Sequence, residues 1–261
     1  MRALEELDRD ACQRLDGVVF DIDDTITDDG RITEAAYAAL WRLRGAGLAL
    51  VAVTGRPLGW CDVLAQLAPV DLAVAENGAG WVWREGRRLR EGYWDDEAER
   101  ARQAARLEAL VATVAAELPA VELAEDQRHR RVDLAFDVAE NVQLPAADVA
   151  HLTDLVRAAG AQVLVSSVHA HAFFGRHDKA TGVVRAAREV LGRDVAGAPE
   201  RWLFIGDSGN DAAAFAYFPL SVGVANVRHH LPRLPVPPAY VTRAERAAGF
   251  AEMADHVLAR R

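Results

Sequence analysis

Four short apolar runs recur along this chain, at residues 18–20, 47–53, 72–75 and 202–205, and polar residues follow each of them at once. Such uninterrupted runs are typical of strands that are buried on both faces of a parallel sheet. Between the first two runs, Thr33 is a plausible N-cap for a helix over residues 34–44 that is closed by Gly45. This strand–helix–strand order predicts an α/β fold with a parallel sheet and right-handed crossovers.

The hydrophobic pattern changes between about residues 86 and 175. It predicts a long amphipathic helix over residues 95–118, two strands at 121–124 and 132–138, a helix near 145–159 and two strands at 162–168 and 170–174. The order α-β-β-α-β-β describes a compact α+β module. We therefore expect a core domain made of residues 1–85 and 176–261, with residues 86–175 inserted as a second domain.

The alternation of strands and helices resumes after this module. A helix is predicted over residues 179–191, where Gly192 stops it, and a shorter helix ends before Pro219. Further strands are expected near Val222 and Tyr240. The chain thus returns to the α/β pattern of its first part.

Acidic residues follow two of the predicted strands. The first run opens onto Asp21, Asp23 and Asp24, and the fourth run onto Asp207 and Asp211. Open α/β sheets bind their ligands at the carboxyl ends of the strands, so both clusters are expected at one site. Carboxylates that lie close together repel one another unless a cation holds them, and an all-oxygen cluster that keeps some waters suits Mg²⁺. Together the clusters predict one magnesium-assisted phosphoryl-transfer site.

Composition narrows the class of protein. The 261 residues suit one or two domains, and 39 acidic against 30 basic residues give a formal charge of -9, so neither nucleic acid nor an anionic membrane is expected as a partner. Only Cys12 and Cys61 occur, the first residues lack the apolar core of a signal peptide, and no apolar stretch approaches the roughly 20 residues of a membrane span. We expect a soluble cytoplasmic protein, a monomer or homodimer, whose partner is a phosphorylated small molecule.

Four motifs occur along the chain in this order: Asp21-Ile22-Asp23-Asp24-Thr25, Thr54-Gly55-Arg56-Pro57, Lys179 and Gly206-Asp207-Ser208-Gly209-Asn210-Asp211. With the inserted module, nearly the whole chain resembles haloacid dehalogenase superfamily phosphatases of subfamily IIB, which include Cof-type, sucrose-phosphate and mannosyl-3-phosphoglycerate phosphatases. The resemblance implies a Rossmann-like core and a C2-type cap inserted after the third core strand. It also implies a Mg²⁺-dependent phosphatase that hydrolyses a phosphate monoester of a sugar or related small metabolite through an aspartyl-phosphate.

The resemblance assigns catalytic roles to four residues. Asp21 is the expected nucleophile, and Asp23 is the expected general acid and then the general base. A metal-bound carboxylate stays ionised to attack phosphorus, whereas its neighbour must carry a proton for the leaving oxygen. Thr54 is expected to hydrogen-bond the transferring phosphoryl oxygens, and Lys179 to place its ammonium on these oxygens and on Asp21.

The resemblance also implies a magnesium site made of Asp21, Asp23, Asp207 and Asp211. Asp207 would bind Mg²⁺ beside the Asp21 carboxylate and the backbone carbonyl of Asp23, and Asp211 would orient the active-site lysine or a metal-bound water. Asp24 departs from the family, which most often has glycine where the chain turns sharply. An extra carboxylate there would either tighten metal binding or make the neighbouring acid Asp23 harder to ionise, and the sequence leaves both effects open.

Substrate choice is expected to lie in the cap, which would close over the core and exclude water. The basic run from Arg128 to Arg131 offers positive charge, with an exposed hairpin tip as the alternative. His169 and His171 face one side of a strand, where simple packing is the alternative because Phe173 continues the same face. The expected phosphate or substrate contacts are Gly55, Arg56, Asn77, Ser208, Asn210, His169, His171 and Arg130.

Other functions compete with phosphate hydrolysis. A calcium loop over the first acidic cluster fails, because Ile26 and Ile32 stand where the EF-hand pattern needs Gly and Glu. A serine esterase with Ser208 as nucleophile would need an Asp-x-x-His late in the chain, and here Asp255 and His256 are adjacent. A phosphomannomutase-like phosphosugar mutase and a catalytically silent metabolite-binding protein stay open as alternatives.

Overall fold

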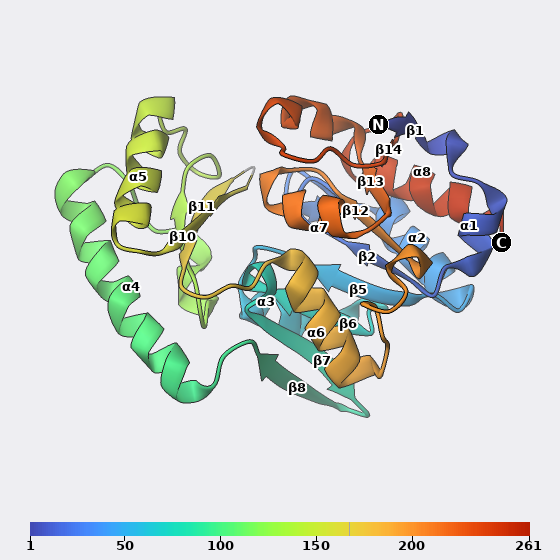
Figure 1. Ribbon diagram of the computed structural model, residues 1–261, viewed down its shortest axis with the longest axis horizontal. Coiled ribbons are helices and arrows are strands. Elements are labelled where there is room, and N and C mark those ends of the chain that lie inside the picture. Colours follow the sequence, from blue (N-terminus) through green and yellow to red (C-terminus); the bar gives the residue numbers. More distant parts are fainter. Residues whose placement is uncertain (167) are drawn as a thin grey trace.

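A nine-stranded sheet lies at the centre of the larger part of the computed structural model, which describes residues 1–166 and 168–261 (Figure 1). Across the sheet the strands follow the order β1 (Arg2–Ala3), β14 (Tyr240–Val241), β13 (Leu220–Gly223), β12 (Trp202–Gly206), β2 (Gly17–Phe20), β5 (Ala49–Val53), β6 (Leu72–Ala75), β7 (Gly80–Glu85) and β8 (Arg88–Tyr93). Neighbouring strands from β1 to β6 are parallel, and β7 and β8 add an antiparallel hairpin at the far edge. The predicted α/β fold with a parallel sheet is confirmed.

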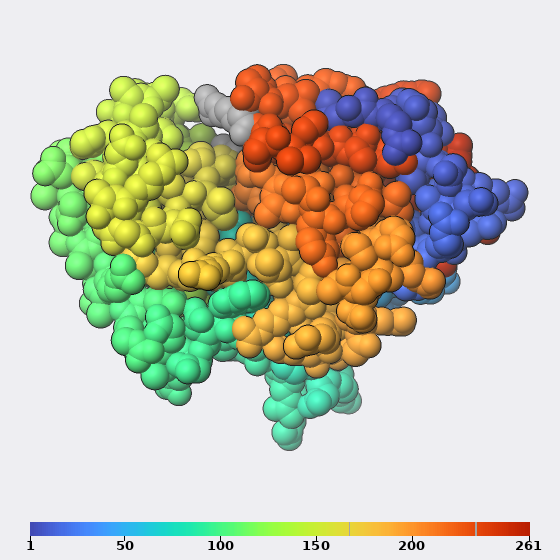
Figure 2. Space-filling view, in the orientation of Figure 1, coloured from blue at the N-terminus to red at the C-terminus, as the bar shows by residue number. Residues whose placement is uncertain are grey.

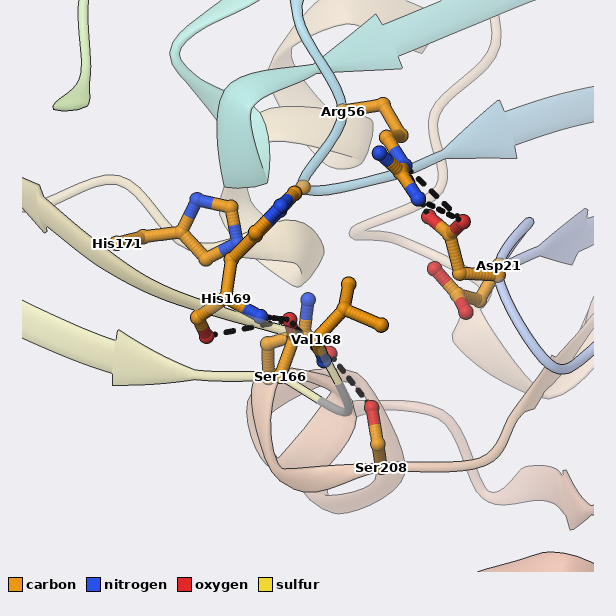
Figure 3. Close-up of a pocket in the computed structure, with 10 residues that line it drawn as sticks. Asp21, Arg56, Ser166, Val168, His169, His171 and Ser208 are labelled. Atoms are coloured by element: carbon orange, nitrogen blue, oxygen red, sulfur yellow. Dashed lines mark hydrogen bonds and ion pairs between the residues drawn. The ribbon is translucent and has the colours of Figure 1, made fainter. Parts of the chain in front are cut away.

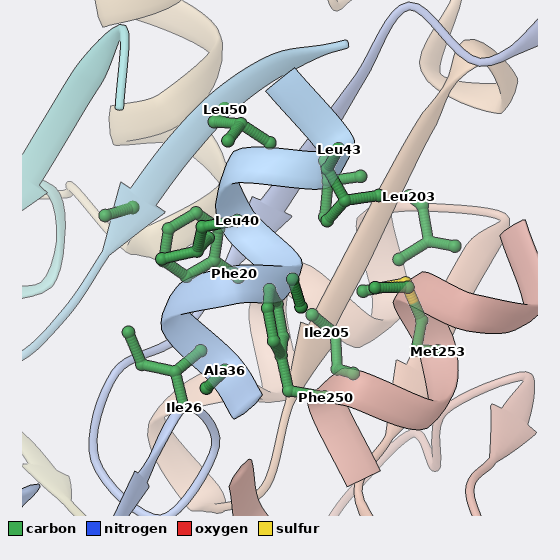
Figure 4. Packing of buried hydrophobic residues seen from close by; sticks show 14 of the residues in the cluster. Phe20, Ile26, Ala36, Leu40, Leu43, Leu50, Leu203, Ile205, Phe250 and Met253 are labelled. Atoms are coloured by element: carbon green, nitrogen blue, oxygen red, sulfur yellow. The ribbon is translucent and has the colours of Figure 1, made fainter. Parts of the chain in front are cut away.

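Helices bury both faces of this sheet, because successive side chains of each strand point to opposite faces. In β2, Val18 and Phe20 pack into one hydrophobic cluster and Val19 into another. The first cluster includes residues of α1 (Arg9–Arg14), α2 (Glu34–Gly45), α3 (Leu58–Leu67) and α8 (Arg246–Leu258), and the second includes residues of α6 (Lys179–Leu191) and α7 (Ala212–Tyr217). Figure 4 shows Phe20, Leu43 and Phe250 of the first cluster between the sheet, α2 and α8.

Capping residues mark the ends of two helices, and the sequence predicts two of these residues, Thr33 and Gly192. The Thr33 hydroxyl accepts a hydrogen bond at 3.2 Å from the N–H three residues on, and α2 begins at the next residue. The Asp178 carboxylate accepts the equivalent bond at 2.8 Å, and Gly192 ends α6 in the left-handed region with φ 62°. Such caps satisfy backbone groups that have no partner within the helix. They make Lys179 the first residue of α6.

A smaller unit lies between β8 and α6 in the chain and is called the small unit below; the rest is the large unit. It contains α4 (Glu97–Glu117), α5 (Ala146–Ala158) and a three-stranded antiparallel sheet in the order β10 (Gln162–Val165), β11 (His169–Phe173), β9 (Leu134–Asp137). These elements enclose a separate hydrophobic cluster. Figure 2 shows the small unit, green to yellow, packed against the large unit. Among the described residues, no helix has the length and apolar character needed to cross a membrane.

The small unit has one strand fewer than the sequence predicts. Residues 121–124 were expected as a strand, but here Leu123 makes a single bridge to Phe136 of β9. The segment forms only two backbone hydrogen bonds with β9, because the chain then turns into a 3₁₀ helix, Glu125–His129 (η3). The predicted strand 162–168 ends at Val165, and its residue 167 lies outside the described residues.

The structure also adds elements that the hydrophobic pattern does not show. A short hairpin of β3 (Thr27–Asp28) and β4 (Arg31–Ile32) follows the first acidic cluster. The strand β8 pairs with β7 in the large sheet, so the chain leaves this sheet after Tyr93. The division of the chain into two domains at residues 86 and 175 stays a prediction.

Replacing Leu43 by Ala tests the packing of α2 on the sheet. Leu43 is fully buried, whereas Leu67, at the end of α3, is 68% exposed. We expect Leu43→Ala to lower the free energy of unfolding by about 2–5 kcal/mol, because it removes buried methyl groups and leaves a cavity. The matched change Leu67→Ala should alter this free energy by less than about 0.5 kcal/mol. Urea unfolding measures both, and equal effects would contradict the packing described.

Candidate active site

The predicted acidic clusters meet at one edge of the large sheet. The strands β2 and β12 are neighbours, with Phe20 opposite Ile205, and Asp21 and Asp207 directly follow these strands. The Asp21 N–H donates to the Ile205 carbonyl at 2.9 Å, which extends the ladder by one residue. Thr54 follows β5, the neighbour of β2 on its other side. Parallel pairing therefore brings together polar residues from distant parts of the chain.

Lys179 joins the two acidic clusters through buried ion pairs. Its Nζ lies 2.5 Å from Asp21 Oδ1 and 2.6 Å from Asp211 Oδ1, and all three side chains are buried. Burial raises the pKa of Asp21 to about 7, and the Lys179 ammonium opposes this rise. Burial by itself would lower the pKa of Lys179, but the two carboxylates raise it above its usual value. The lysine is thus held charged between the two acids.

Three buried acids form a group that could hold a metal ion. The ligand atoms of Asp21, Asp207 and Asp211 lie within 4.8 Å of one another. Asp207 Oδ1 is buried and accepts no hydrogen bond from the residues that the structure describes. Burial, with the charges of Asp21 and Asp211, raises the pKa of Asp207 well above its usual value. A buried carboxylate oxygen without a donor is costly, and a divalent cation would relieve that cost. The residues present therefore fit such a cation.

Asn226 is a functional residue that the sequence motifs miss, and it orients Asp207. It lies in the 3₁₀ helix Ala225–His229 (η6), just after β13, and its Nδ2 donates to Asp207 Oδ2 and to the Asp24 carbonyl, both at 3.1 Å. Its Oδ1 accepts from the Arg246 N–H at 2.9 Å. Because a backbone N–H can only donate, this contact determines which end of the amide faces Asp207. One Asp207 oxygen is thereby held and the other is left for a cation.

Asp24 occupies a turn that favours glycine. Its φ is 53°, in the left-handed region, where Asp is better tolerated than most residues. Its carboxylate lies 3.2 Å from Arg246 Nε at the start of α8. The pKa of Asp207 is raised first by burial and by the neighbouring acids, and the charge of Asp24 adds to this. The extra carboxylate therefore acts on the metal-binding group, while a guanidinium balances part of its charge.

A row of hydrogen-bonded neutral side chains lies beside the acids. Ser208 Oγ donates to Asn210 Oδ1, and Asn210 Nδ2 donates to Asn77 Oδ1, each at 3.0 Å. Asn77 Nδ2 is buried and donates to none of the described residues. Thr54 Oγ1 accepts from the Arg56 N–H at 2.9 Å. The structure thus brings these four predicted contacts to one edge of the sheet, where Asn77 has a donor available for an anion.

Arg56 connects the large unit with the small unit. Its guanidinium donates to both oxygens of Asp23 at 2.9 to 3.0 Å. It also lies 3.2 Å from Asp126 and 2.8 Å from Glu140, two acids of the small unit. The hydrogen bond from His169 and the pair with Arg56 lower the pKa of Glu140 to about 2. The carboxylate of Asp23 is therefore bound to Arg56 and stands apart from the three acids of the metal group.

Arg130, His169 and His171 are buried residues of the small unit. Arg130 Nη1 donates to the Gly55 carbonyl at 2.8 Å and to Asp133 at 2.9 Å. His171 lies 3.1 Å from Asp133, and burial with the charge of Arg130 lowers the pKa of His171. A Cβ at Gly55 would lie 2.9 Å from His171 Nε2, so this close approach requires glycine. Arg130 is therefore not at an exposed hairpin tip, and that alternative is wrong for this residue.

The two units close around a small cavity. The space open to the centre of a water molecule is about 10 Å³, which holds about one water. Figure 3 shows Arg56 and Asp21 facing His169 and His171 across this space. In this arrangement the cavity has no room for a small-molecule substrate. The lining residues are Asp21, Asp23, Gly55, Arg56, Ser166, Val168, His169, His171, Ser208 and Asn210.

Comparisons with known proteins agree with this fold. Residues 18–97 match the model of a haloacid dehalogenase-like hydrolase family, and no curated protein matches the chain. A Thermoplasma acidophilum structure, described as protein 0175, has 18% identity and a TM-score of 0.71 over 93% of this chain and 98% of that chain. The sucrose-phosphatase of Synechocystis, solved with sucrose and phosphate, has 18% identity and a TM-score of 0.66, again over 93% and 98%. A sugar phosphatase of haloacid dehalogenase subclass IIB has 17% identity and a TM-score of 0.59, over 92% and 98%.

Residues 18–97 thus resemble the haloacid dehalogenase-like hydrolase family, and the chain shares the fold of the subclass IIB sugar phosphatase. The matched family region contains the first acidic cluster, Thr54 and Asn77. The predicted Rossmann-like fold class is thereby confirmed, and the match over residues 18–97 supports the predicted family. The individual site residues stay predictions, supported by the contacts described above.

Replacing Asn226 by Ala tests the cation site. Asp207 then loses its orienting donor, so the affinity for Mg²⁺ should fall about 10- to 100-fold. The rise in melting temperature during a Mg²⁺ titration measures this affinity. Asn141→Ala, at an exposed position of the small unit, is the matched control and should leave the affinity unchanged. Equal Mg²⁺ affinity in the wild type and in Asn226→Ala would contradict the role given to Asn226.

Proposed function

We propose that this protein is a Mg²⁺-dependent phosphatase that hydrolyses a phosphate monoester of a sugar or related small metabolite through an aspartyl-phosphate. The observation that carries the proposal is the buried pair of Asp21 and Lys179 beside Asp207 and Asp211. A carboxylate that attacks a phosphoryl group needs fixed positive charge around both partners. A catalytically silent binding protein has no need of the whole set.

The negative charge around the phosphoryl group would be balanced by two sources of positive charge, a bound Mg²⁺ and Lys179. Asp21, Asp207 and Asp211 would hold the Mg²⁺, which supplies positive charge to the phosphoryl oxygens and to the nucleophile. Lys179 adds its ammonium, which binds Asp21 and Asp211. The unpaired Nδ2 of Asn77 offers a further donor at the same edge. The chain's own residues thus bind the phosphate and hold Asp21 in place.

The reaction takes two steps on Asp21. First, an Asp21 oxygen attacks phosphorus, the bond from phosphorus to the leaving oxygen breaks, and this oxygen takes a proton from Asp23. Second, a water attacks the same phosphorus, Asp23 takes a proton from the water, and the bond to Asp21 breaks. Phosphate and alcohol are the products, and both acids return to their starting states.

Asp23 is ionised while it is paired with Arg56, so it can take up a proton and then donate it only after Arg56 has left it. In the closed arrangement both oxygens of Asp23 accept hydrogen bonds from Arg56, which also pairs with Asp126 and Glu140. We propose that the small unit is the cap. Its opening withdraws Asp126 and Glu140, and Arg56 then turns from Asp23 to the leaving group when the cap closes again. In this way, proton transfer by Asp23 is linked to closure of the cap over the substrate.

A hydroxyl-rich leaving group suits the cap side of the cavity. Arg130 is paired with Asp126 and Asp133 and so leaves little positive charge for a second anionic group. Ser166 and His169 of the small unit, and Ser208 of the large unit facing them, offer polar atoms. Sugar phosphatases among the similar structures have the same fold, which agrees with this substrate class. Both cysteines are free and buried, which suits a cytoplasmic location.

Replacing Asp21 by Asn tests the proposed nucleophile. We expect phosphate release from a panel of sugar phosphates, glycosyl-phosphoglycerates and an aryl phosphate to fall by about 10³-fold or more, because the amide cannot form the aspartyl-phosphate. Asp29→Asn makes the same chemical change at a side chain that is 94% exposed and should keep the wild-type rate. Each protein is assayed with and without Mg²⁺.

The outcomes of this assay separate the candidate functions. Mg²⁺-dependent release that Asp21→Asn loses would support the phosphatase and rank its substrates. A wild-type rate in Asp21→Asn would be incompatible with the aspartyl-phosphate. Rearrangement of a phosphosugar without phosphate release would favour the mutase.

A further inference from the structure

Glu76 is a buried acid that does not line the catalytic cavity. It follows β6 in the 3₁₀ helix Glu76–Gly78 (η2), is 1% exposed and lies in the left-handed region with φ 49°. Residues other than glycine are uncommon in this region, and such a conformation persists only where the surroundings hold it. None of the proposed chemical steps uses its carboxylate. A strained and buried acid without a catalytic task needs another explanation.

The Glu76 carboxylate accepts four backbone hydrogen bonds. Oε1 accepts from the N–H groups of Leu58 at 3.0 Å and Arg131 at 2.9 Å, and Oε2 accepts from Val132 at 2.7 Å and Asp133 at 3.0 Å. Leu58 belongs to the large unit, but the other three donors are consecutive residues of the small unit. Hydrogen bonds to a carboxylate are stronger than those between neutral groups. One side chain of the large unit thus holds a whole loop of the small unit.

The Glu76 carboxylate is stabilised in its buried position by the N–H groups that donate to it. Burial, and then the charge of Asp133, raise the pKa of Glu76 to about 7, whereas Arg130 and the backbone N–H groups lower it. Without the loop, three of the four hydrogen bonds would be lost, and water would have to replace them. The four hydrogen bonds of the Glu76 carboxylate are therefore complete only in the closed arrangement of the two units.

The loop held by Glu76 also places groups at the cavity. Arg130 precedes the loop and Asp133 ends it, and Asp133 binds both Arg130 and His171. On the side of the large unit, the Glu76 N–H donates to the Arg56 carbonyl at 3.0 Å. The position of the loop on Glu76 therefore decides where His171 and Arg130 stand relative to Arg56.

The contacts of Glu76 differ from the other contacts between the units. The ion pairs with Asp126 and Glu140 involve Arg56, which lines the cavity, so a leaving group bound there would compete for its guanidinium. The bonds of Glu76 end on backbone N–H groups outside the lining of the cavity. They can therefore form in the same way whatever substrate is bound.

We propose that Glu76 is a positioning residue that seats the small unit on the large unit. When the units close, its carboxylate captures the N–H groups of residues 131–133, and so sets Arg130 on the Gly55 carbonyl and His171 against the cavity. The inference rests on contacts between the units and holds whatever the substrate is.

Hydrogen–deuterium exchange of the full chain tests this seat in the wild type, in Glu76→Gln and in Glu85→Gln. Gln keeps the size of the side chain but loses the charge and one acceptor oxygen, so the amides of residues 131–133 should exchange about 10-fold faster or more. Amides of β2 and β12 should keep their wild-type rates. Glu85, on the adjacent strand β7 with a side chain 63% exposed, is the matched control and should change neither group.

Mg²⁺ affinity, measured from the melting temperature, is the second readout and should stay at the wild-type value in Glu76→Gln. Faster exchange in β2 and β12 as well would indicate a general structural role and overturn the proposal, as would unchanged exchange at residues 131–133. If Glu76→Gln does not fold, hydrogen–deuterium exchange of the wild type by itself tests the proposal. The wild-type amides at 131–133 should exchange through an opening that leaves β12 protected. Exchange of both groups only by global unfolding would show that no seating movement exists.

Discussion

The buried ammonium of Lys179 between two carboxylates is the interaction on which the site depends. Parallel pairing of β2 and β12 puts the acids of both strands side by side, and buried like charges favour protonation unless a cation balances them. Lys179 reaches them because α6 begins at this residue and packs closely on the turn after β6. A Cβ at Gly182 would lie 2.4 Å from the Cα of Gly78, so two glycines allow this approach. The fold therefore brings the balancing charge to the acids through backbone packing.

Closure of the small unit imposes a second constraint on the chemistry. Arg56 ties Asp23 to acids of the small unit, Arg130 reaches the Gly55 carbonyl, and the cavity between them holds about one water. A closed site with little water strengthens every charge interaction inside it, and in the proposed function the units separate to admit the substrate. Contacts at the cavity, such as those of Arg56, must give way to the substrate. Contacts away from it, such as those of Glu76, can restore one closed geometry in each cycle.

The sequence predicts those residues of the candidate site that lie at the ends of strands. Asp21, Asp207 and Thr54 each come directly after an apolar run, and parallel strands end at one edge, so their meeting follows from the pattern. Asn226 also follows a strand at this edge, and a polar residue there is the signal that could have indicated it. Its role still depends on the Arg246 N–H, which orients the amide from another part of the chain. Nothing near Asn226 in the sequence encodes that contact.

The sequence by itself determined the apolar strands of the parallel sheet, the start of α2, the end of α6 and the acidic edge, because side-chain periodicity and capping act between residues that are neighbours in the chain. Only the tertiary structure decided that Arg130 is buried, that Asp23 binds Arg56, and that residues 121–124 form a single bridge. It also decided that Glu76 binds a loop of the other unit. These outcomes depend on which loops meet when the two units pack. Such contacts join residues that are far apart in the sequence, so no local sequence pattern predicts them.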